Sequence, residues 1–76
     1  MIEFLEFVAK HLVDNPDAVV IEKEDQDKRI VFKLKVAQTD LGKVIGKGGK
    51  TAAALRLLLR AVAAKEGKRA VLDIVG

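Results

Sequence analysis

The residues best suited to chemistry form a run of glycines and lysines in the middle of the chain, residues 44–50, with the sequence VIGKGGK. Glycine lets a ligand approach the backbone itself, because no side chain holds the ligand at a distance. A long helical pattern opens directly after this run, and the unpaired N–H groups at a helix N-terminus favour an anion. Lys43, Lys47 and Lys50 add positive charge around the loop. These residues predict a clamp for phosphate groups.

The charge is distributed unevenly along the chain. Residues 1–27 contain two basic and eight acidic residues, a formal charge of −6, whereas residues 28–76 contain twelve basic and three acidic residues, a formal charge of +9. The basic excess lies in the part that contains the glycine loop, which favours a polyanionic partner. Charge alone supports a solvated, lysine-bearing surface equally well.

The residue types that are absent argue against catalysis. The chain has no Cys, Ser, Tyr or Trp and a single histidine, His11, and its only side-chain hydroxyls are those of Thr39 and Thr51. Nucleophilic catalysis needs a Ser, Cys or Thr beside a base, and a structural zinc site needs a Cys/His cluster. We therefore expect no enzyme, no metal site, no cofactor and no small-molecule substrate.

Length and composition predict one globular domain over residues 1–76, half hydrophobic and one third charged. The first residues carry acids where a signal peptide needs Lys or Arg. No apolar run approaches the ~18 residues that span a bilayer. Without cysteines, a reducing compartment is natural, and we expect a cytoplasmic protein without a membrane partner.

Hydrophobic spacing predicts the first three elements. Residues 2–13 have helical periodicity, with Leu5, Val8 and Leu12 on one face and two phenylalanines widening the stripe. Residues 18–23 read as a short strand, and residues 29–36 alternate as a strand with one buried face. The two strands are joined by a short polar turn, so we expect a hairpin. The three phenylalanines (Phe4, Phe7 and Phe32) and His11 are assigned to packing.

The second half of the chain predicts two helices and a last strand. Thr39 or Asp40 is expected to cap a short helix over residues 41–45. A longer helix follows the glycine loop over residues 50–65 and ends at Gly67. A last strand covers residues 70–75. The expected buried stripe of the long helix contains Leu55, Leu58, Leu59 and Val62.

The predicted order, α-β-β-α-α-β, belongs to the α+β class. The first strand pairs with the second in an antiparallel hairpin. The second and third strands are parallel, since the two intervening helices form a crossover. All three helices then cover one face of a three-stranded mixed sheet.

Two common phosphate-binding motifs fail on this loop. The pattern G-x-x-x-x-G-K-[ST] matches at Gly49-Lys50-Thr51, but it requires glycine at position 44, which is Val44. The pattern G-x-G-x-x-G requires glycine at position 51, which is Thr51. Both motifs also follow a strand, whereas this loop lies between two predicted helices.

Residues 44–49, VIGKGG, resemble the signature (Ile/Val)-Ile-Gly-x-x-Gly of the KH domain, whose loop also lies between two helices. The element order is similar to the type II, prokaryotic KH arrangement along the whole chain. The length is similar to that of the small stand-alone bacterial KH proteins of the KhpA type. One departure is Ala52, where many KH domains carry isoleucine, so the apolar floor near the loop is narrower here.

The KH resemblance implies a single-stranded RNA-binding protein, with single-stranded DNA as a further ligand, whose loop clamps the backbone of about four nucleotides. It also implies an RNA chaperone or post-transcriptional regulator that affects cell shape and cell wall biogenesis, acting as a homodimer or with a second KH-containing RNA-binding protein. Lys68 and Arg69 adjoin the expected groove and serve equally well as solvated residues, whereas Lys33 and Lys35 lie outside it. The predicted RNA-binding residues are Lys43, Val44, Ile45, Gly46, Lys47, Gly48, Gly49, Lys50 and Arg56.

Two other functions compete with RNA binding. A DNA-binding helix-turn-helix protein needs polar base-reading residues at the start of its recognition helix, and residues 51–54, TAAA, offer few. A protein–protein interaction module is the other alternative. An exposed apolar sheet face bearing Val31, Val71 and Val75 would serve it as an interface.

Overall fold

The computed structural model describes residues 2–76. Its helices are α1 (Ile2–Leu12), α2 (Leu41–Ile45) and α3 (Lys50–Ala64), and its strands are β1 (Val20–Asp25), β2 (Arg29–Lys35) and β3 (Arg69–Val75). Single turns of 3₁₀ helix, η1 (Pro16–Ala18) and η2 (Gln38–Asp40), lie between them, and η3 (Lys47–Gly49) is a tight turn in which Gly48 has non-helical φ and ψ angles. The order of helices and strands is the predicted one. Strand β1 begins later than expected because η1 occupies the residues after Pro16.

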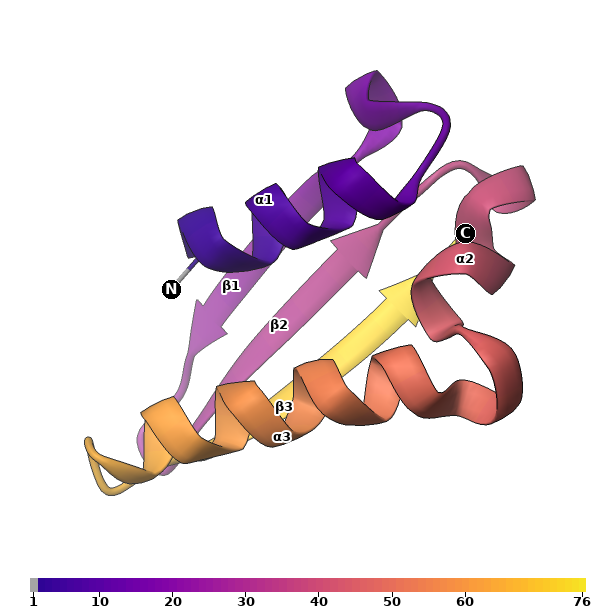
Figure 1. The fold of residues 1–76 in the computed structure, drawn as a ribbon. Helices are drawn as coiled ribbons and strands as arrows, with labels where there is room; N and C mark the ends of the chain where they lie inside the picture. The colour runs from indigo at the N-terminus through magenta and orange to yellow at the C-terminus, as the bar shows by residue number, and fades with distance from the viewer. Residues whose placement is uncertain (1) are drawn as a thin grey trace.

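The three strands form one mixed sheet in the order β1-β2-β3. Strand β1 is antiparallel to β2, with Ile21 opposite Leu34, and β2 is parallel to β3, with Phe32 opposite Leu72. The helices lie on one face of this sheet (Figure 1). These observations confirm the predicted α+β fold. Among the described residues, no helix is long and apolar enough to cross a bilayer.

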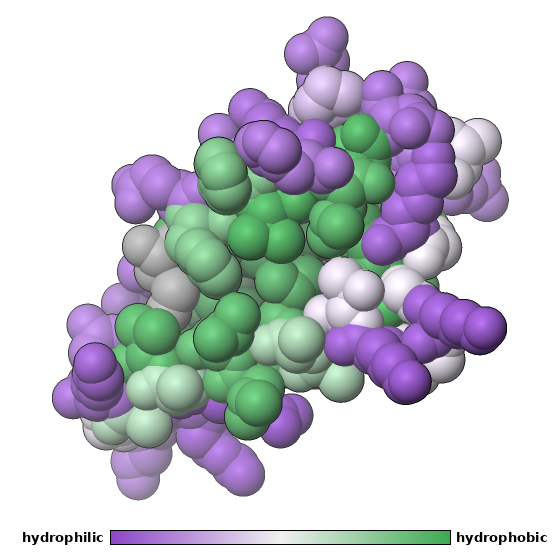
Figure 2. All heavy atoms as spheres, viewed as in Figure 1, coloured by the Kyte–Doolittle hydropathy of each residue, from purple (hydrophilic) through white to green (hydrophobic). Residues whose placement is uncertain are grey.

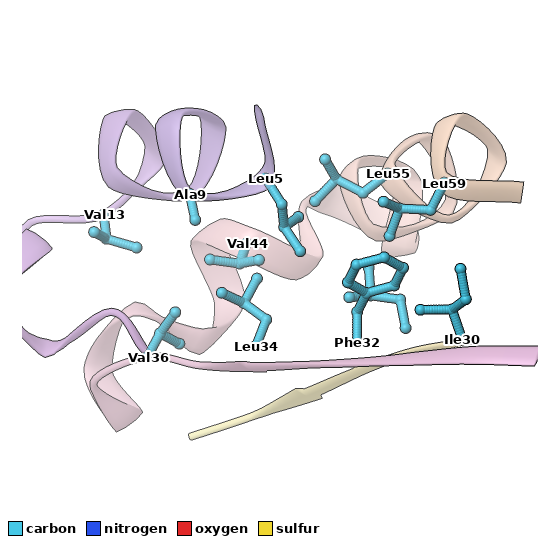
Figure 3. Close-up of a cluster of buried hydrophobic side chains, with 11 residues drawn as sticks. Leu5, Ala9, Val13, Ile30, Phe32, Leu34, Val36, Val44, Leu55 and Leu59 are labelled. Atoms are coloured by element: carbon cyan, nitrogen blue, oxygen red, sulfur yellow. The ribbon is translucent and has the colours of Figure 1, made fainter. Parts of the chain in front are cut away.

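The core lies between the helices and the sheet, with the inward side of β2 at its centre (Figure 3). Side chains alternate across a strand, so one face of β2 is buried and the other is exposed. Its inward residue Phe32 is only 1% exposed. Leu5 of α1, Val44 of α2 and Leu59 of α3 pack into the same cluster. The predicted alternation of β2 is therefore confirmed.

Helix α3 buries a narrower stripe than predicted. The buried residues are Ala52, Leu55, Leu59 and Ala63, whereas Leu58 and Val62 are 48% and 45% exposed. The alanines take part because their small side chains let the helix backbone lie close to the sheet. The prediction was correct for Leu55 and Leu59 and wrong for Leu58 and Val62, since it favoured large apolar residues over alanine.

The assignment of phenylalanines to the core was wrong for two of the three. Phe4 and Phe7 of α1 are 46% and 62% exposed. The Phe7 ring packs against His11, with ring centroids 4.3 Å apart and planes inclined by 40°. A ring nitrogen of His11 also lies 2.8 Å from the Phe7 carbonyl oxygen. His11 therefore has a packing role, but on the protein surface.

Asp40 occupies the predicted N-cap position of α2, but its side chain makes no capping hydrogen bond to the helix. Its carboxylate is 1% exposed and accepts hydrogen bonds from the backbone N–H groups of Asp14 (3.2 Å) and Asn15 (3.0 Å). The side-chain amide of Asn15 donates a further bond of 3.1 Å. Asp40 thus joins the segment after α1 to the beginning of α2, and it does so from inside the protein.

Candidate nucleic-acid interface

The glycine loop turns the chain sharply between α2 and α3. Gly46, Gly48 and Gly49 have φ angles of 78°, 64° and 76°. Gly46 combines this φ with a ψ of 169°, a region that is essentially restricted to glycine. A Cβ atom on Gly46 would lie 2.3 Å from Oγ1 of Thr51. Gly46 is therefore required by the turn itself.

Gly48 and Gly49 face open space instead. No heavy atom lies within 4 Å of the position that a Cβ would occupy on either residue. Helix α3 begins directly afterwards with Gly49 as its N-cap, and no side chain caps its first turn. The N–H groups of Gly49 and Lys50 donate to the carbonyls of Gly46 and Lys47 within the loop. The N–H groups that follow them in the first turn are those that a helix start leaves for an anion. The loop backbone and the start of α3 thus form one accessible surface.

The lysines around the loop are not equivalent. Lys47 and Lys50 are exposed, and neither forms an ion pair within residues 2–76. The ammonium of Lys43 instead binds the carboxylate of Asp14 and lies 3.6 Å from that of Asp40. The hydrogen bond to Asp14, with the charge of Asp40, raises the pKa of Lys43 despite partial desolvation. Lys43 is thus paired with one exposed carboxylate, Asp14, and one buried carboxylate, Asp40, whereas Lys47 and Lys50 have uncompensated charge.

Two effects oppose each other on the pKa of Asp40. Burial favours the protonated form, but hydrogen bonds from Asp14 and Asn15 favour the carboxylate, and Lys43 adds charge attraction. Their balance lowers the pKa below its usual value of 3.8. Asp40 is therefore a buried anion that holds Lys43 and the base of α2 in place.

The predicted apolar wall is divided between core and surface. Val44 is fully buried, and Ala52 is 2% exposed. Ile45 is half-buried beside the loop, so it is the apolar residue available to a ligand there. Arg56 is half-buried on α3, beyond the first turn of the helix. The structure therefore places Ile45 and residues 46–50 together, with Arg56 further along α3.

Lys68 and Arg69, for which the sequence left both a binding role and a solvated role open, lie at the other end of α3. Lys68 Nζ is 2.6 Å from Asp25 Oδ1, and this bond raises the pKa of Lys68 and lowers that of Asp25. Arg69 is exposed and has no ion-pair partner in the described part of the chain. Figure 1 shows this end of α3 and the start of β3 far from the glycine loop.

An apolar surface between α1 and α3 was missed by the sequence analysis. Phe4 and residues of α3, including Leu58 and Val62, line a surface groove of about 390 Å³. Hydrophobic residues gather on this helix-covered face (Figure 2). On the opposite sheet face, Val71 is 40% exposed, Val31 and Val75 are half-buried, and Lys33 and Lys35 are exposed. The sequence did contain a sign of this groove, because the apolar stripe on α3 is broader than a single buried face of the helix needs.

A Gly-x-x-Gly loop between two helices, on an α-β-β-α-α-β scaffold with a mixed sheet, defines the class as a KH domain of type II. The sequence model of the KhpA/KhpB KH-domain family matches residues 2–74. The chain therefore belongs to the KhpA/KhpB family.

Several relatives are similar over nearly their whole length. The RNA-binding protein KhpA of Caldanaerobacter subterraneus subsp. tengcongensis is 48% identical over 73 residues, which is 96% of this chain and 97% of the relative. The RNA-binding protein KhpA of Clostridium acetobutylicum is 47% identical over 75 residues, covering 99% and 100%. That of Aquifex aeolicus is 47% identical over 73 residues, covering 96% and 92%. No solved structure matches the chain significantly.

Proposed function

We propose that this chain binds single-stranded RNA by clamping the sugar-phosphate backbone on its Gly-x-x-Gly loop. The observation that carries the proposal is the open backbone of Gly48 and Gly49, which continues into the uncapped first turn of α3. The open glycines let a phosphate approach, and phosphate oxygens accept hydrogen bonds from the N–H groups that the start of a helix leaves unpaired. The names of the relatives, RNA-binding proteins, support RNA as the ligand.

Each residue near the loop has a distinct role in this proposal. Lys47 and Lys50 attract the phosphates, since their charges are uncompensated. Ile45 provides an apolar contact for a base, and Arg56 contacts the strand as it passes along α3. Lys43 contributes less, because it is paired with two carboxylates. Val44 supports the loop from the core.

The proposal includes a single KH domain over residues 1–76. It also places the binding role in the cytoplasm. The KH resemblance suggests an RNA chaperone or post-transcriptional regulator with effects on cell shape and cell wall biogenesis. The chain offers little for catalysis, since its hydroxyls are limited to Thr39 and Thr51. Single-stranded DNA is a further ligand if the clamp reads only the phosphate backbone.

A protein partner is favoured by the apolar groove between α1 and α3. Phe4, Leu58 and Val62 expose nearly half of their surfaces there, and contiguous exposed apolar surface often marks an interface. We propose that this groove, rather than the sheet face expected from the sequence, joins the chain to a second copy or to a second KH-containing RNA-binding protein. Two linked KH domains would then bind one RNA with greater avidity.

Fluorescence anisotropy with a labelled single-stranded RNA, a matched DNA and a matched duplex tests the proposed function. The decisive variant is Lys47→Asp/Gly48→Asp, and circular dichroism checks its fold. Lys33→Asp/Lys35→Asp is a control on the open sheet face. We expect the control to bind single strands within a few-fold of the wild type, while the loop variant loses binding. Equal binding by the loop variant and the wild type, or no binding by the wild type, would contradict the proposal.

A further inference from the structure

The buried carboxylate of Asp40 takes no part in the proposed RNA contacts. Asp40 is the one charged side chain that is buried within residues 2–76. Three hydrogen bonds join it to the segment after α1, two from the backbone N–H groups of Asp14 and Asn15 and one from the Asn15 side-chain amide. These partners lie 26 and 25 residues earlier in the sequence, so the carboxylate ties two distant segments together. A buried charge is costly unless it is hydrogen-bonded, so its geometry is closely defined.

Helix α2 depends on the rest of the protein for its orientation. It has five residues, and a helix this short is not stable on its own. Leu41 and Val44 pack it against the core, but apolar contacts are non-directional. Hydrogen bonds depend on distance and angle, so the bonds of Asp40, at the N-cap of α2, define the direction of the helix. The ion pair between Lys43 and Asp14 spans the same segments, but it is exposed to solvent, where ion pairs are weak.

The direction of α2 determines where the glycine loop begins. The N–H group of Gly46 donates to the Gly42 carbonyl oxygen at 2.9 Å, and that of Gly49 donates to the Gly46 carbonyl oxygen at 3.0 Å. Hydrogen bonds therefore connect the loop with the helix that Asp40 orients. A binding surface needs its groups held within about 0.5 Å of the productive geometry. A tilt of α2 would thus disturb the contact between the loop and a phosphate.

We propose that Asp40 is a positioning residue for RNA binding. Its carboxylate anchors α2 to the segment after α1 and so holds the glycine loop in the geometry that receives the phosphate backbone. The proposal rests on the proposed function, because it concerns the support of the same loop. Asp40 is buried and does not touch the RNA. Removal of its negative charge would by itself favour a polyanionic ligand, whereas loss of the positioning role weakens binding, so the two effects have opposite signs.

Fluorescence anisotropy with a labelled single-stranded RNA tests this role, at a temperature where circular dichroism shows each variant to be folded. We expect Asp40→Asn to bind about fivefold more weakly than the wild type, roughly the effect of one lost hydrogen bond. Asn15→Ala removes only the bond of 3.1 Å and should cause a smaller loss, which keeps the test decisive if Asp40→Asn does not fold.

Two control variants separate positioning from charge and from stability. Asp73→Asn removes the same charge from the open sheet face, opposite Lys33, and should bind RNA at least as tightly as the wild type. Ile30→Val destabilises the core at the start of β2, where Ile30 is 4% exposed, and should leave RNA affinity unchanged. In ¹⁵N spectra of the free proteins, amide shifts in residues 46–51 should appear in Asp40→Asn but not in Ile30→Val.

Binding by Asp40→Asn as tight as binding by Asp73→Asn would overturn the positioning role. An equal loss of affinity in Ile30→Val would also overturn it, since it would show an effect of stability alone. Loop amides that do not shift in Asp40→Asn would contradict it as well. Failure of the loop itself has a different signature, namely retention of RNA binding by Lys47→Asp/Gly48→Asp. The two failures are therefore distinguishable in one set of measurements.

Discussion

Gly46 and Thr51 approach so closely across the turn that a Cβ atom on Gly46 would lie 2.3 Å from the Thr51 hydroxyl oxygen and 2.7 Å from its Cβ. This contact packs the end of α2 against the first turn of α3. We predict that Gly46→Ala lowers the free energy of unfolding. The strained backbone conformation alone costs ~1–3 kcal/mol, and the clash with Thr51 adds to this cost. Urea denaturation monitored by circular dichroism measures this change.

Gly42→Ala is the matched control for that substitution. Gly42 lies within α2, and a Cβ there meets no heavy atom within 4 Å. Alanine should therefore stabilise the helix by roughly 0.5–1 kcal/mol. Thr51→Ala in the Gly46→Ala background should recover only part of the loss, since the strained φ remains. A Gly46→Ala protein as stable as the wild type would refute this account of the turn.

Substitutions of Lys43 and Lys47 should have different effects, the first on stability and the second on RNA binding. Lys43→Gln removes the partner of Asp14 and Asp40, so we expect a Tm lower by a few degrees and little change in RNA affinity. Lys47→Gln should leave Tm unchanged, weaken RNA binding several-fold and reduce the salt slope by about 0.7. Thermal denaturation and anisotropy on both proteins test the pair. The reverse assignment of the two effects would refute the proposed roles.

The lowered pKa of Asp40 predicts how the stability of the fold depends on pH. Its pKa is lower in the folded protein than the usual 3.8, so the unfolded chain takes up the proton first as the pH falls. Asp40 therefore stabilises the fold above about pH 4, and this contribution is lost as the pH falls through the folded pKa.

Asp40→Asn isolates this contribution. The amide does not titrate, and its NH₂ group cannot accept a hydrogen bond, so the bond from either Asp14 or Asn15 is lost. We expect Asp40→Asn to be less stable than the wild type at pH 7, with the difference narrowing below pH 4. Asp25, whose pKa is also lowered, titrates in both proteins and cancels from the comparison. A difference that is constant with pH would contradict the assignment.

The apolar groove makes a prediction about assembly. Leu58→Lys should weaken association with a second copy, because it places a charge on the exposed surface beside Phe4 and Val62. Val71→Lys, on the sheet face, is the control, since Val71 has a similar exposure of 40%. Analytical ultracentrifugation over a range of concentrations measures the equilibrium. Greater loss of self-association in Val71→Lys would instead support the sheet face as the interface.

Local patterns were sufficient to predict the fold. Strict alternation in β2 identified the buried residues Ile30, Phe32 and Leu34. Gly67, predicted to end the long helix, has a φ of 71° and lies in the turn after α3, which itself ends at Ala64. The parallel pairing of β2 and β3 followed from the length of the helical crossover between them. These features depend on backbone geometry and periodicity, which a sequence records directly.

Contacts between distant segments were beyond prediction from the sequence. The pairing of Lys43 with Asp14 and the burial of Asp40 depend on how the segment after α1 meets α2. The exposure of Leu58 and Val62 depends on the space left between α1 and α3. Periodicity shows that a helix has an apolar side, but it does not show how much of that side the neighbouring elements cover.

The most direct test of the central claim is an NMR titration of the ¹⁵N-labelled protein with a short single-stranded RNA. We predict that the largest amide shifts occur in residues 46–51, followed by Ile45 and Arg56, while Lys33 and Lys35 on the open sheet face do not move. This result would place the phosphate backbone on the glycine loop and the start of α3. Shifts confined to the sheet face or to the apolar groove, with the loop amides unchanged, would contradict the account.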